Sequence, residues 1–297
     1  MKPRNCYIIG SGYLASLFRE GCLLNESVPI LVTDRPFQGG SCGWEVIGTA
    51  EFLRRLDEGL HPLDLAVNAT GPSTAAIGKE ESDRWLGRQS LLLEAMAQSH
   101  LPPKMVLVSS GGTVYGDQGA SPISEVSELR GATPYARYQI AMEESYHEVF
   151  GRHLTVLRVA NPYGMHQFGK SGQGFVVTLI RNLLADQITT VFGRGELVRD
   201  YFYEDDLYSL IPALFSVASA GIFNIGSGEG LSQNSVIETV AKAFGRTPKL
   251  VFVSGRITDI PCNILSTRAA KEALGWYPKT GLELGLIRMC QKLQGSL

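Results

Sequence analysis

Short apolar runs alternate with longer amphipathic stretches through the first half of the chain. The apolar runs lie at 6–10, 28–34, 64–71, 104–112 and 153–161, and helix-like stretches lie at 13–24, 52–60, 83–99 and 134–150. Continuous apolar strands separated by helices of ten or more residues are typical of a parallel sheet covered on both faces. Right-handed crossovers then give an α/β fold with a doubly wound parallel sheet.

The second half is less regular. Glycine and proline interrupt 161–175 and 191–202, and helical stretches follow at 174–185, 204–217, 233–244, 267–275 and 281–294. We expect a smaller, discontinuous C-terminal substrate-binding domain. The expected division gives the sheet domain 1–161, with 197–226 returning to it, and gives the smaller domain 162–196 and 227–297.

A glycine-rich turn joins the first apolar run to the first helix-like stretch and reads G-x-G-x-x-A from Gly10 to Ala15. The first glycine permits a tight turn, the second lets the backbone approach a pyrophosphate, and the small alanine lets helix and strand pack closely. Helix N–H groups then face the phosphates. The turn predicts a Rossmann-type dinucleotide site contacted by Gly10, Ser11, Gly12, Tyr13 and Leu14. An ordinary turn without a ligand is the alternative.

An acidic residue ends the second apolar run. Asp34 lies 22 residues after Gly12, where a carboxylate accepts hydrogen bonds from an adenosine ribose and repels a 2′-phosphate. This favours NAD, although Arg35, directly after it, leaves NADP open. The alternative is a solvent-exposed Asp–Arg pair.

Composition narrows the class of ligand. Apolar residues make up 44% of the chain, charged residues 19%, and the formal net charge is −2. That balance gives no general attraction to nucleic acid or to an anionic membrane, so local arginines and N–H groups must hold any anionic ligand. Neither a targeting segment nor an apolar run of 18 residues is visible, and we expect a cytoplasmic protein. The five cysteines and five histidines lack ligand spacing, so we expect no metal.

Six further motifs occur in one order along nearly the whole chain. They are VLVSSGGTVYG at 106–116, Pro-Tyr at 134–135, LRVANPYG at 157–164, VRDYFYEDDL at 198–207, FNIGSG at 223–228 and a C-terminal signature within 255–278. Together they resemble the extended short-chain dehydrogenases/reductases, specifically the NAD-dependent nucleotide-sugar epimerases and dehydratases of the UDP-glucose 4-epimerase type and their 4-ketosugar reductase relatives.

The resemblance implies a nucleotide-diphosphate sugar as substrate and a set of binding residues. Asn161, Arg199 and Arg256 stand where the family holds the diphosphate, which suits the bidentate contacts of guanidinium groups. Phe192 stands near the base and Asp259 near a nucleotide-contacting acid. The resemblance also places Ala69, Thr70, Gly71 and Ser109 on the cofactor, and it implies a homodimer through 81–99 and 134–150. For each arginine alone, the alternative is a surface salt bridge.

The catalytic cluster departs from the family pattern. The family uses a tyrosine, a nearby Ser or Thr, and a lysine four residues after the tyrosine, on the same helix face. Here the tyrosine is Tyr135, but position 139 is Gln, giving Y-x-x-x-Q. A cation lowers the pKa of a tyrosine acid/base and a neutral amide does so less, although it can still donate to the nicotinamide ribose. We therefore expect a higher Tyr135 pKa, slower chemistry or an altered direction of use.

Two other positions also differ. Gly111 stands where the family's catalytic hydroxyl commonly lies, which leaves Ser110 and Thr113 as the candidate hydroxyls. By its position Gly111 itself is expected beside the substrate. Gly48-Thr49 stands where the family has Gly-Asp beside the adenine.

These departures leave three functions open. The first is an NAD(P)-dependent epimerase that inverts C4 through a transient 4-keto sugar. The second is a 4-ketosugar reductase that consumes NADH or NADPH. The third is a dinucleotide-binding protein without turnover. Dehydration is disfavoured because Gly-Gly-Thr at 111–113 replaces the T-D-E of the family's dehydratases.

Overall fold

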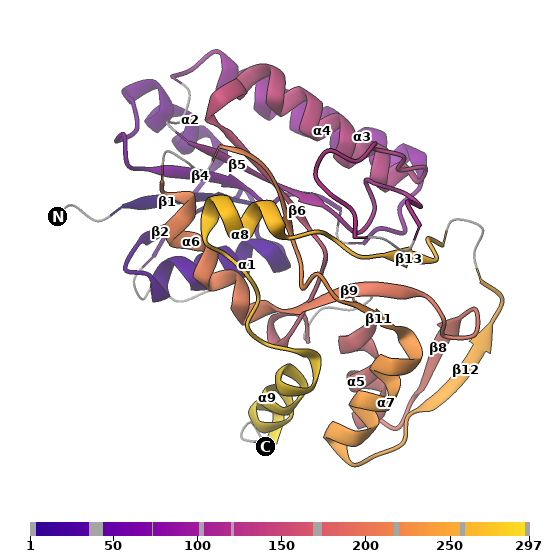
Figure 1. Cartoon of the computed structure of the whole chain (residues 1–297). Helices are drawn as coiled ribbons and strands as arrows, with labels where there is room; N and C mark the ends of the chain where they lie inside the picture. The colour runs from indigo at the N-terminus through magenta and orange to yellow at the C-terminus, as the bar shows by residue number, and fades with distance from the viewer. Residues whose placement is uncertain are drawn as a thin grey trace.

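The computed structural model describes residues 4–35, 44–72, 74–100, 104–119, 122–168, 174–216, 220–255 and 259–294. Its larger part is a seven-stranded, wholly parallel sheet in the order β10-β6-β5-β4-β1-β2-β3 (Figure 1). The predicted doubly wound α/β fold is confirmed. The strands are β1 (Asn5–Ile9), β2 (Val28–Val32), β3 (Glu45–Ile47), β4 (Leu65–Asn68), β5 (Met105–Ser110), β6 (Leu154–Val159) and β10 (Gly221–Ile225).

Helices cover both faces of this sheet and enclose one core on each. Phe18 of α1 and Val67 of β4 belong to the first core, and Phe52 of α2 and Met142 of α4 belong to the second. Neighbouring side chains of one strand enter opposite cores, which is why the strands read as continuous apolar runs. The helices are α1 (Tyr13–Leu24), α2 (Thr49–Glu58), α3 (Lys79–Ala97) and α4 (Pro134–Phe150), with the short turn η1 (Gly151–His153) after α4.

The start of α4 fixes the position of the predicted catalytic tyrosine. The Thr133 hydroxyl accepts a hydrogen bond from the backbone N–H of Ala136 at 3.1 Å, and Pro134 occupies the first turn. Both are strong signals for a helix N-terminus. Tyr135 therefore lies in the first turn, and Gln139 lies one turn further along the same face.

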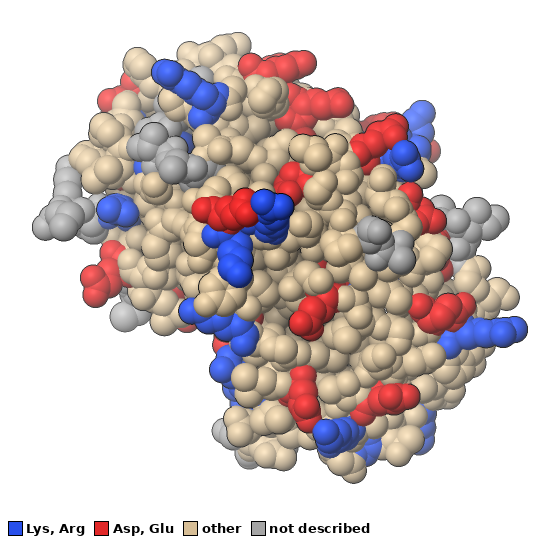
Figure 2. Space-filling model, in the orientation of Figure 1, with Lys and Arg blue, Asp and Glu red and all other residues tan. Residues whose placement is uncertain are grey.

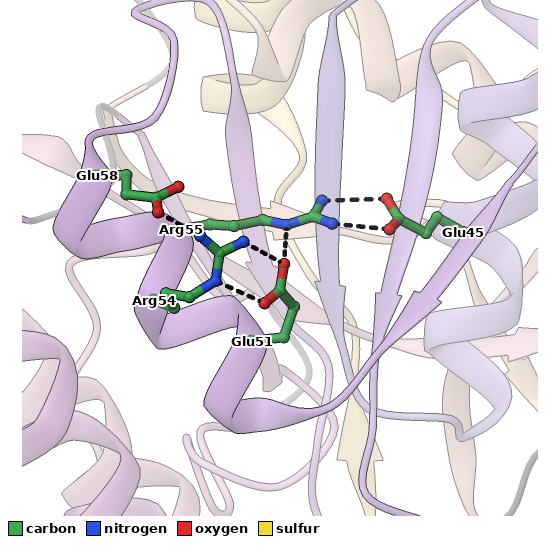
Figure 3. A network of polar contacts seen from close by, with 5 residues as sticks. All are labelled: Glu45, Glu51, Arg54, Arg55 and Glu58. Carbon is green, nitrogen blue, oxygen red and sulfur yellow. Dashed lines mark hydrogen bonds and ion pairs between the residues drawn. The ribbon is translucent and has the colours of Figure 1, made fainter.

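A surface network ties the edge strand β3 to α2 (Figure 3). The Arg55 guanidinium donates to both carboxylate oxygens of Glu45, at 2.7 and 3.0 Å, and its Nε donates to Glu51 at 2.8 Å. Arg54 also bonds Glu51, and together the two arginines lower the pKa of Glu51 to about 2. The network holds the first turn of α2 against the sheet edge, near Asp34.

A smaller region follows the sheet and has a core of its own. Its strands are β7 (Asn161–Tyr163), β8 (Ile188–Phe192), β9 (Val198–Tyr203), β11 (Gly230–Ser232), β12 (Lys249–Val253) and β13 (Cys262–Asn263). Its helical segments are η2 (Met165–Gln167), α5 (Phe175–Leu184), α7 (Gln233–Phe244) and α9 (Leu282–Gln294), and α5, α7 and α9 lie together at the bottom of Figure 1. Strand β9 joins the two parts, because Tyr201 and Tyr203 enter the smaller core and Phe202 enters the first core of the sheet.

Two expectations for the second half need correction. The helix expected at 204–217 is a 3-10 helix, η3 (Glu204–Leu210), followed by the short α6 (Ile211–Leu214). The assignment of all of 227–297 to the smaller domain fails at α8 (Arg268–Leu274), because Ala270 and Trp276 pack in the first core of the sheet. The Trp276 indole N–H also donates to the backbone carbonyl of Asp206 at 2.9 Å.

Charge on the molecule is mixed in sign. Figure 2 shows basic and acidic side chains interspersed over one face, as the small net charge leads one to expect. Within the described ranges, no helix is both long enough and apolar enough to cross a membrane.

Candidate functional site

A cavity of about 910 Å³ opens where the strands of the parallel sheet end. Ligands of open α/β sheets bind at this edge, outside the carboxyl ends of the strands. Fifteen residues singled out from the sequence line the cavity: Gly10, Ser11, Gly12, Tyr13, Leu14, Asp34, Arg35, Ala69, Thr70, Gly71, Ser109, Ser110, Tyr135, Gln139 and Asn161.

The glycine turn is shaped for a pyrophosphate. Gly10 has a φ of +115°, which favours glycine, and a Cβ there would lie 2.8 Å from the Thr70 side chain. A Cβ at Gly12, just before α1, would meet nothing within 4 Å. The backbone at Gly12 is therefore open to the cavity at a helix N-terminus, the arrangement that binds phosphate.

The side chain of Tyr13 is used elsewhere. Its hydroxyl donates to a carboxylate oxygen of Glu204 at 2.8 Å, and Glu204 is fully buried. The same carboxylate accepts the backbone N–H of His166 at 3.0 Å and lies 2.9 Å from its Nδ1. Burial raises the pKa of Tyr13 well above its usual value. Tyr13 can thus offer a cofactor its backbone, whereas its side chain links the glycine turn to η3 and, through Glu204, to η2.

Thr49 holds the carboxylate of Asp34. Its backbone N–H donates to Oδ1 at 2.8 Å and its hydroxyl donates to Oδ2 at 2.6 Å. The hydroxyl is the larger cause, and together these bonds lower the pKa of Asp34. Asp34 is therefore ionised and oriented at the cavity wall, and each of its oxygens keeps a lone pair for a ligand hydroxyl.

Tyr135 and Gln139 meet at the cavity wall. The Gln139 amide Nε2 donates to the Tyr135 hydroxyl oxygen at 3.0 Å, and Gln139 is buried. Burial raises the pKa of Tyr135, while hydrogen bonding by the side chains of Gln139 and Ser110 acts in the opposite direction. A donor to the phenol oxygen favours the phenolate, so the glutamine retains part of the effect of a cation.

The neighbouring candidates are placed differently. Gly111 is buried and outside the cavity lining, and a Cβ there would lie 2.6 Å from Leu265 and 2.8 Å from the backbone oxygen of Arg158. Thr113 is also outside the lining. Of the candidate hydroxyls, Ser110 is the one that lines the cavity and interacts with Tyr135.

Ser109 reaches the cavity but its hydroxyl is directed into the protein, where it donates to Glu143. Glu143 forms a buried ion pair with Arg158 at 2.6 Å, and Arg158 also donates to the Tyr115 hydroxyl at 3.0 Å. The Tyr115 hydroxyl in turn donates to Asn224 at 2.7 Å. This network joins α4, β5, β6 and β10 beneath the site and keeps Ser109 from donating to a ligand.

A second pocket, of about 150 Å³, lies beside the first, and Asn161, Pro162 and Gly174 line both. Arg199 lines this second pocket and donates to the backbone carbonyls of Val198 and Ile260 at 2.8 and 2.6 Å. Burial lowers the pKa of Arg199, although a guanidinium stays charged near neutrality.

Asn161 is held by Asp200, the residue that follows Arg199 in β9. The Asn161 amide donates to the backbone carbonyl of Asp200 at 3.0 Å. The fully buried Asp200 carboxylate accepts the backbone N–H groups of Ser227, Gly228 and Leu265, which ties the turn after β10 and the segment after β13 to β9. Burial raises the pKa of Asp200 and these bonds oppose the rise.

The remaining predicted substrate residues do not line either pocket. Phe192 ends β8, and Asp259 lies near Gly255 and acts electrostatically on Arg199. Arg256 lies outside the described residues. The described ranges contain no group of three or more His, Cys, Asp or Glu side chains that could hold a metal.

Three glutamines in the cavity walls were not predicted. Gln89 of α3 accepts from Asn68 at 2.8 Å and donates to Thr70 at 2.8 Å, which fixes the turn after β4. Gln167 lines the large cavity and Gln233 the small pocket. An uncharged residue in an irregular or helical stretch gives no periodic signal, so no pattern pointed to these three.

Comparison with known sequences decides the family. A family model described as the NAD dependent epimerase/dehydratase family matches residues 64–226, more than half of the chain. The chain belongs to the NAD-dependent epimerase/dehydratase family. A UDP-glucose 4-epimerase of Mycolicibacterium smegmatis is 32% identical to this chain, over 62% of this chain and 60% of that protein.

Two further proteins are similar over comparable lengths or more. A dTDP-4-dehydro-6-deoxyglucose reductase of Escherichia coli is 30% identical over 64% of this chain and 61% of that protein. The chain thus spans about 60% of the length of these two curated relatives. The crystal structure of a UDP-glucose 4-epimerase from Thermotoga maritima with UDP-glucose has a TM-score of 0.85 at 25% identity, covering 98% of this chain and 99% of that one.

Proposed function

We propose that this protein is an NAD-dependent nucleotide-sugar 4-epimerase that works through a transient 4-keto sugar. The observation that carries the proposal is that Tyr135, Ser110 and Gln139 line the large cavity. This cavity adjoins the small pocket that Arg199 lines, and Asn161 belongs to the walls of both. An acid/base group and an anion-binding group are thus reachable by one elongated ligand. The UDP-glucose 4-epimerases of M. smegmatis and T. maritima support the reaction class.

The residues present fit the cofactor. The open backbone at Gly12 suits a pyrophosphate, and the oriented Asp34 carboxylate suits the two hydroxyls of an adenosine ribose. The same carboxylate would repel a 2′-phosphate, so we propose NAD rather than NADP. NAD supplies a hydride acceptor and donor next to the sugar.

Tyr135 would act as the acid/base on the C4 hydroxyl. In the phenolate form it takes the hydroxyl proton as the C4 hydrogen leaves, and it returns the proton to the same oxygen when C4 has been reduced from the other face. Gln139 would stabilise the phenolate, because its amide Nε2 donates a hydrogen bond to the Tyr135 oxygen at 3.0 Å. Ser110 would hydrogen-bond the same sugar oxygen, and Arg199 would hold the diphosphate while the sugar changes orientation between the two hydride transfers.

The proposal is tested on purified protein in two steps. The dinucleotide released on denaturation is identified first, and fresh protein is then incubated with UDP-, dTDP-, GDP- and CDP-sugars without added cofactor. Retained NAD and interconversion of two C4 epimers would support the proposal. No epimer with any sugar, together with stoichiometric oxidation of added NADH or NADPH by a 4-keto sugar, would overturn it.

A 4-ketosugar reductase is the second candidate, and the Y-x-x-x-Q site favours it. A reductase needs Tyr135 to donate a proton, which the raised pKa of this tyrosine permits. The similarity to the E. coli dTDP-4-dehydro-6-deoxyglucose reductase adds support. A dinucleotide-binding protein without turnover is disfavoured, because Tyr135, Ser110 and Gln139 lie together at the cavity wall.

A further inference from the structure

Gln233 is the first residue of α7, and backbone N–H groups at this helix end have hydrogen-bond acceptors. The Ser232 hydroxyl accepts from the backbone N–H of Ser235 at 3.0 Å, and the backbone N–H of Gln233 donates to Leu197 at 3.2 Å. Its side chain is only 9% exposed and lines the small pocket together with Arg199.

The side-chain carbonyl of Gln233 has no partner. Its Oε1 is buried and accepts no hydrogen bond from any residue in the described ranges. A buried carbonyl without a donor costs about 1–3 kcal/mol, so nearly all such groups in proteins are satisfied by protein, water or ligand. Because Gln233 lines a pocket, a ligand bound there can supply the missing donor.

Arg199 restricts what that ligand is. A guanidinium in the same pocket calls for an anion, whereas Oε1 of Gln233 calls for an O–H or N–H group. Diphosphate oxygens are acceptors and cannot satisfy Gln233. A group joined directly to the phosphate that Arg199 would hold can supply this donor.

The size and walls of the pocket indicate which group this is. About 150 Å³ has room for one ring, and Tyr163, Phe175 and Leu197 give it largely apolar walls. Under the proposed function, the dinucleotide and the reacting sugar occupy the large cavity. The small pocket then receives the first ring on the nucleoside side of the diphosphate, which is the ribose.

We propose that Gln233 is a specificity-determining residue whose Oε1 accepts a hydrogen bond from a ribose hydroxyl of the nucleotide sugar. This inference rests on the proposed function and deepens it, because it assigns the small pocket to the ribose of the nucleotide sugar. A 2′-deoxy or 3′-deoxy nucleotide that lacks the bonded hydroxyl leaves the carbonyl orphaned and binds more weakly.

Calorimetric binding provides the test. UDP, GDP and CDP are titrated into wild-type protein, and the tightest binder is compared with its 2′-deoxy and 3′-deoxy forms. We expect one deoxy form to bind about tenfold more weakly than the ribonucleotide, the effect of one hydrogen bond. In Gln233→Leu the ribonucleotide should lose about the same factor, and the discrimination should disappear. Gln233→Met serves as a second variant should the leucine variant unfold.

Gln167→Leu is the matched control. Gln167 is 6% exposed, also has an unpartnered Oε1, and lines the large cavity rather than the small pocket. This variant should keep the discrimination between ribose and deoxyribose. Equal binding of all three ligands by wild type, or equal losses for all three in Gln233→Leu, would overturn the assignment of Gln233 alone. Failure of wild type to bind any nucleoside diphosphate would instead remove the proposed function and this inference with it.

Discussion

The Gln139 amide donates to the Tyr135 hydroxyl oxygen at 3.0 Å, across one turn of α4. In the family pattern a lysine occupies this position. The glutamine supports the phenolate with a dipole instead of a charge, and burial still leaves the pKa of Tyr135 above its usual value. In the proposed proton transfer, the phenolate of Tyr135 is therefore less populated near neutral pH than it would be beside a lysine, so the rate should depend on pH.

Gln139→Lys should move the rise of kcat/KM with pH to lower pH. In the proposed mechanism the active base is the phenolate, so the rate rises as the pH approaches the pKa of Tyr135. A nearby ammonium lowers that pKa by about 1–3 units. The measurement is a pH–rate profile of epimerisation. Gln139→Leu, which removes the donor without adding charge, should move the profile the other way and reduce the rate at neutral pH roughly tenfold. An unchanged profile in the lysine variant would contradict the role given to Tyr135.

Gly111→Ser should destabilise the protein rather than restore a catalytic hydroxyl. The new Cβ would lie 2.6 Å from Leu265 and 2.8 Å from the backbone oxygen of Arg158, and overpacking of this kind costs about 1–3 kcal/mol. The free energy of unfolding is measured by urea titration. Gly112→Ala is the control, because its Cβ meets nothing nearer than 3.8 Å. A serine variant that is as stable as wild type would contradict the lack of space for a side chain at Gly111.

Thr49→Val should weaken NADH binding by roughly fivefold, since it removes the hydroxyl that orients Asp34. The carboxylate keeps its charge near neutral pH, so discrimination against NADPH should remain. Asp34→Asn removes the charge and should narrow the difference between the two cofactors. Fluorescence titration with both reduced cofactors measures this. Equal affinity of wild type for NADH and NADPH would refute the role of Asp34.

His166 should make stability depend on pH. Its hydrogen bond to Glu204 is the main cause of its raised pKa, with further contributions from the charges of Glu20 and Asp205. A folded-state pKa above the unfolded value means that the stabilisation is complete below about pH 6.5 and is lost as the pH rises through the raised pKa. Each unit by which folding raises the pKa of His166 contributes about 1.4 kcal/mol to the free energy of unfolding.

Urea unfolding at pH 6 and pH 8 tests this link. Wild type should lose more stability over that interval than His166→Gln does, and His147→Gln, which changes an exposed histidine of α4, should behave as wild type. If wild type and His166→Gln showed the same pH dependence, the contact between His166 and Glu204 would contribute nothing to the pH dependence of the free energy of unfolding.

The sequence predicted those features that depend on local pattern. The apolar runs located β1, β2, β4, β5 and β6 of the sheet. The helix over 13–24 has the expected bounds, and the glycine turn lies at the cavity. Such features follow from periodicity and from the backbone demands of a tight turn. The edge strand β3 and the short strands around β9 were not foreseen, because strands of three residues or fewer carry little pattern.

Contacts between distant residues could not be predicted. Tyr13 was expected at the cofactor, yet its hydroxyl meets Glu204, 191 positions further along the chain. The direction of the Ser109 hydroxyl depends on Glu143 of another element, and the lack of space at Gly111 depends on Leu265. Each of these is set by tertiary packing. A motif fixes the position of a residue in the chain but not the partner of its side chain.

The most direct test of the epimerase follows the hydrogen on C4. The sugar nucleotide that the protein turns over is prepared with deuterium at C4 and incubated without added cofactor, and the epimeric product is examined by mass spectrometry and NMR. The proposed mechanism predicts an inverted C4 that still carries the deuterium, because the hydrogen leaves and returns within one active site. An epimer without deuterium, or no epimer from any nucleotide sugar in the panel, would contradict it.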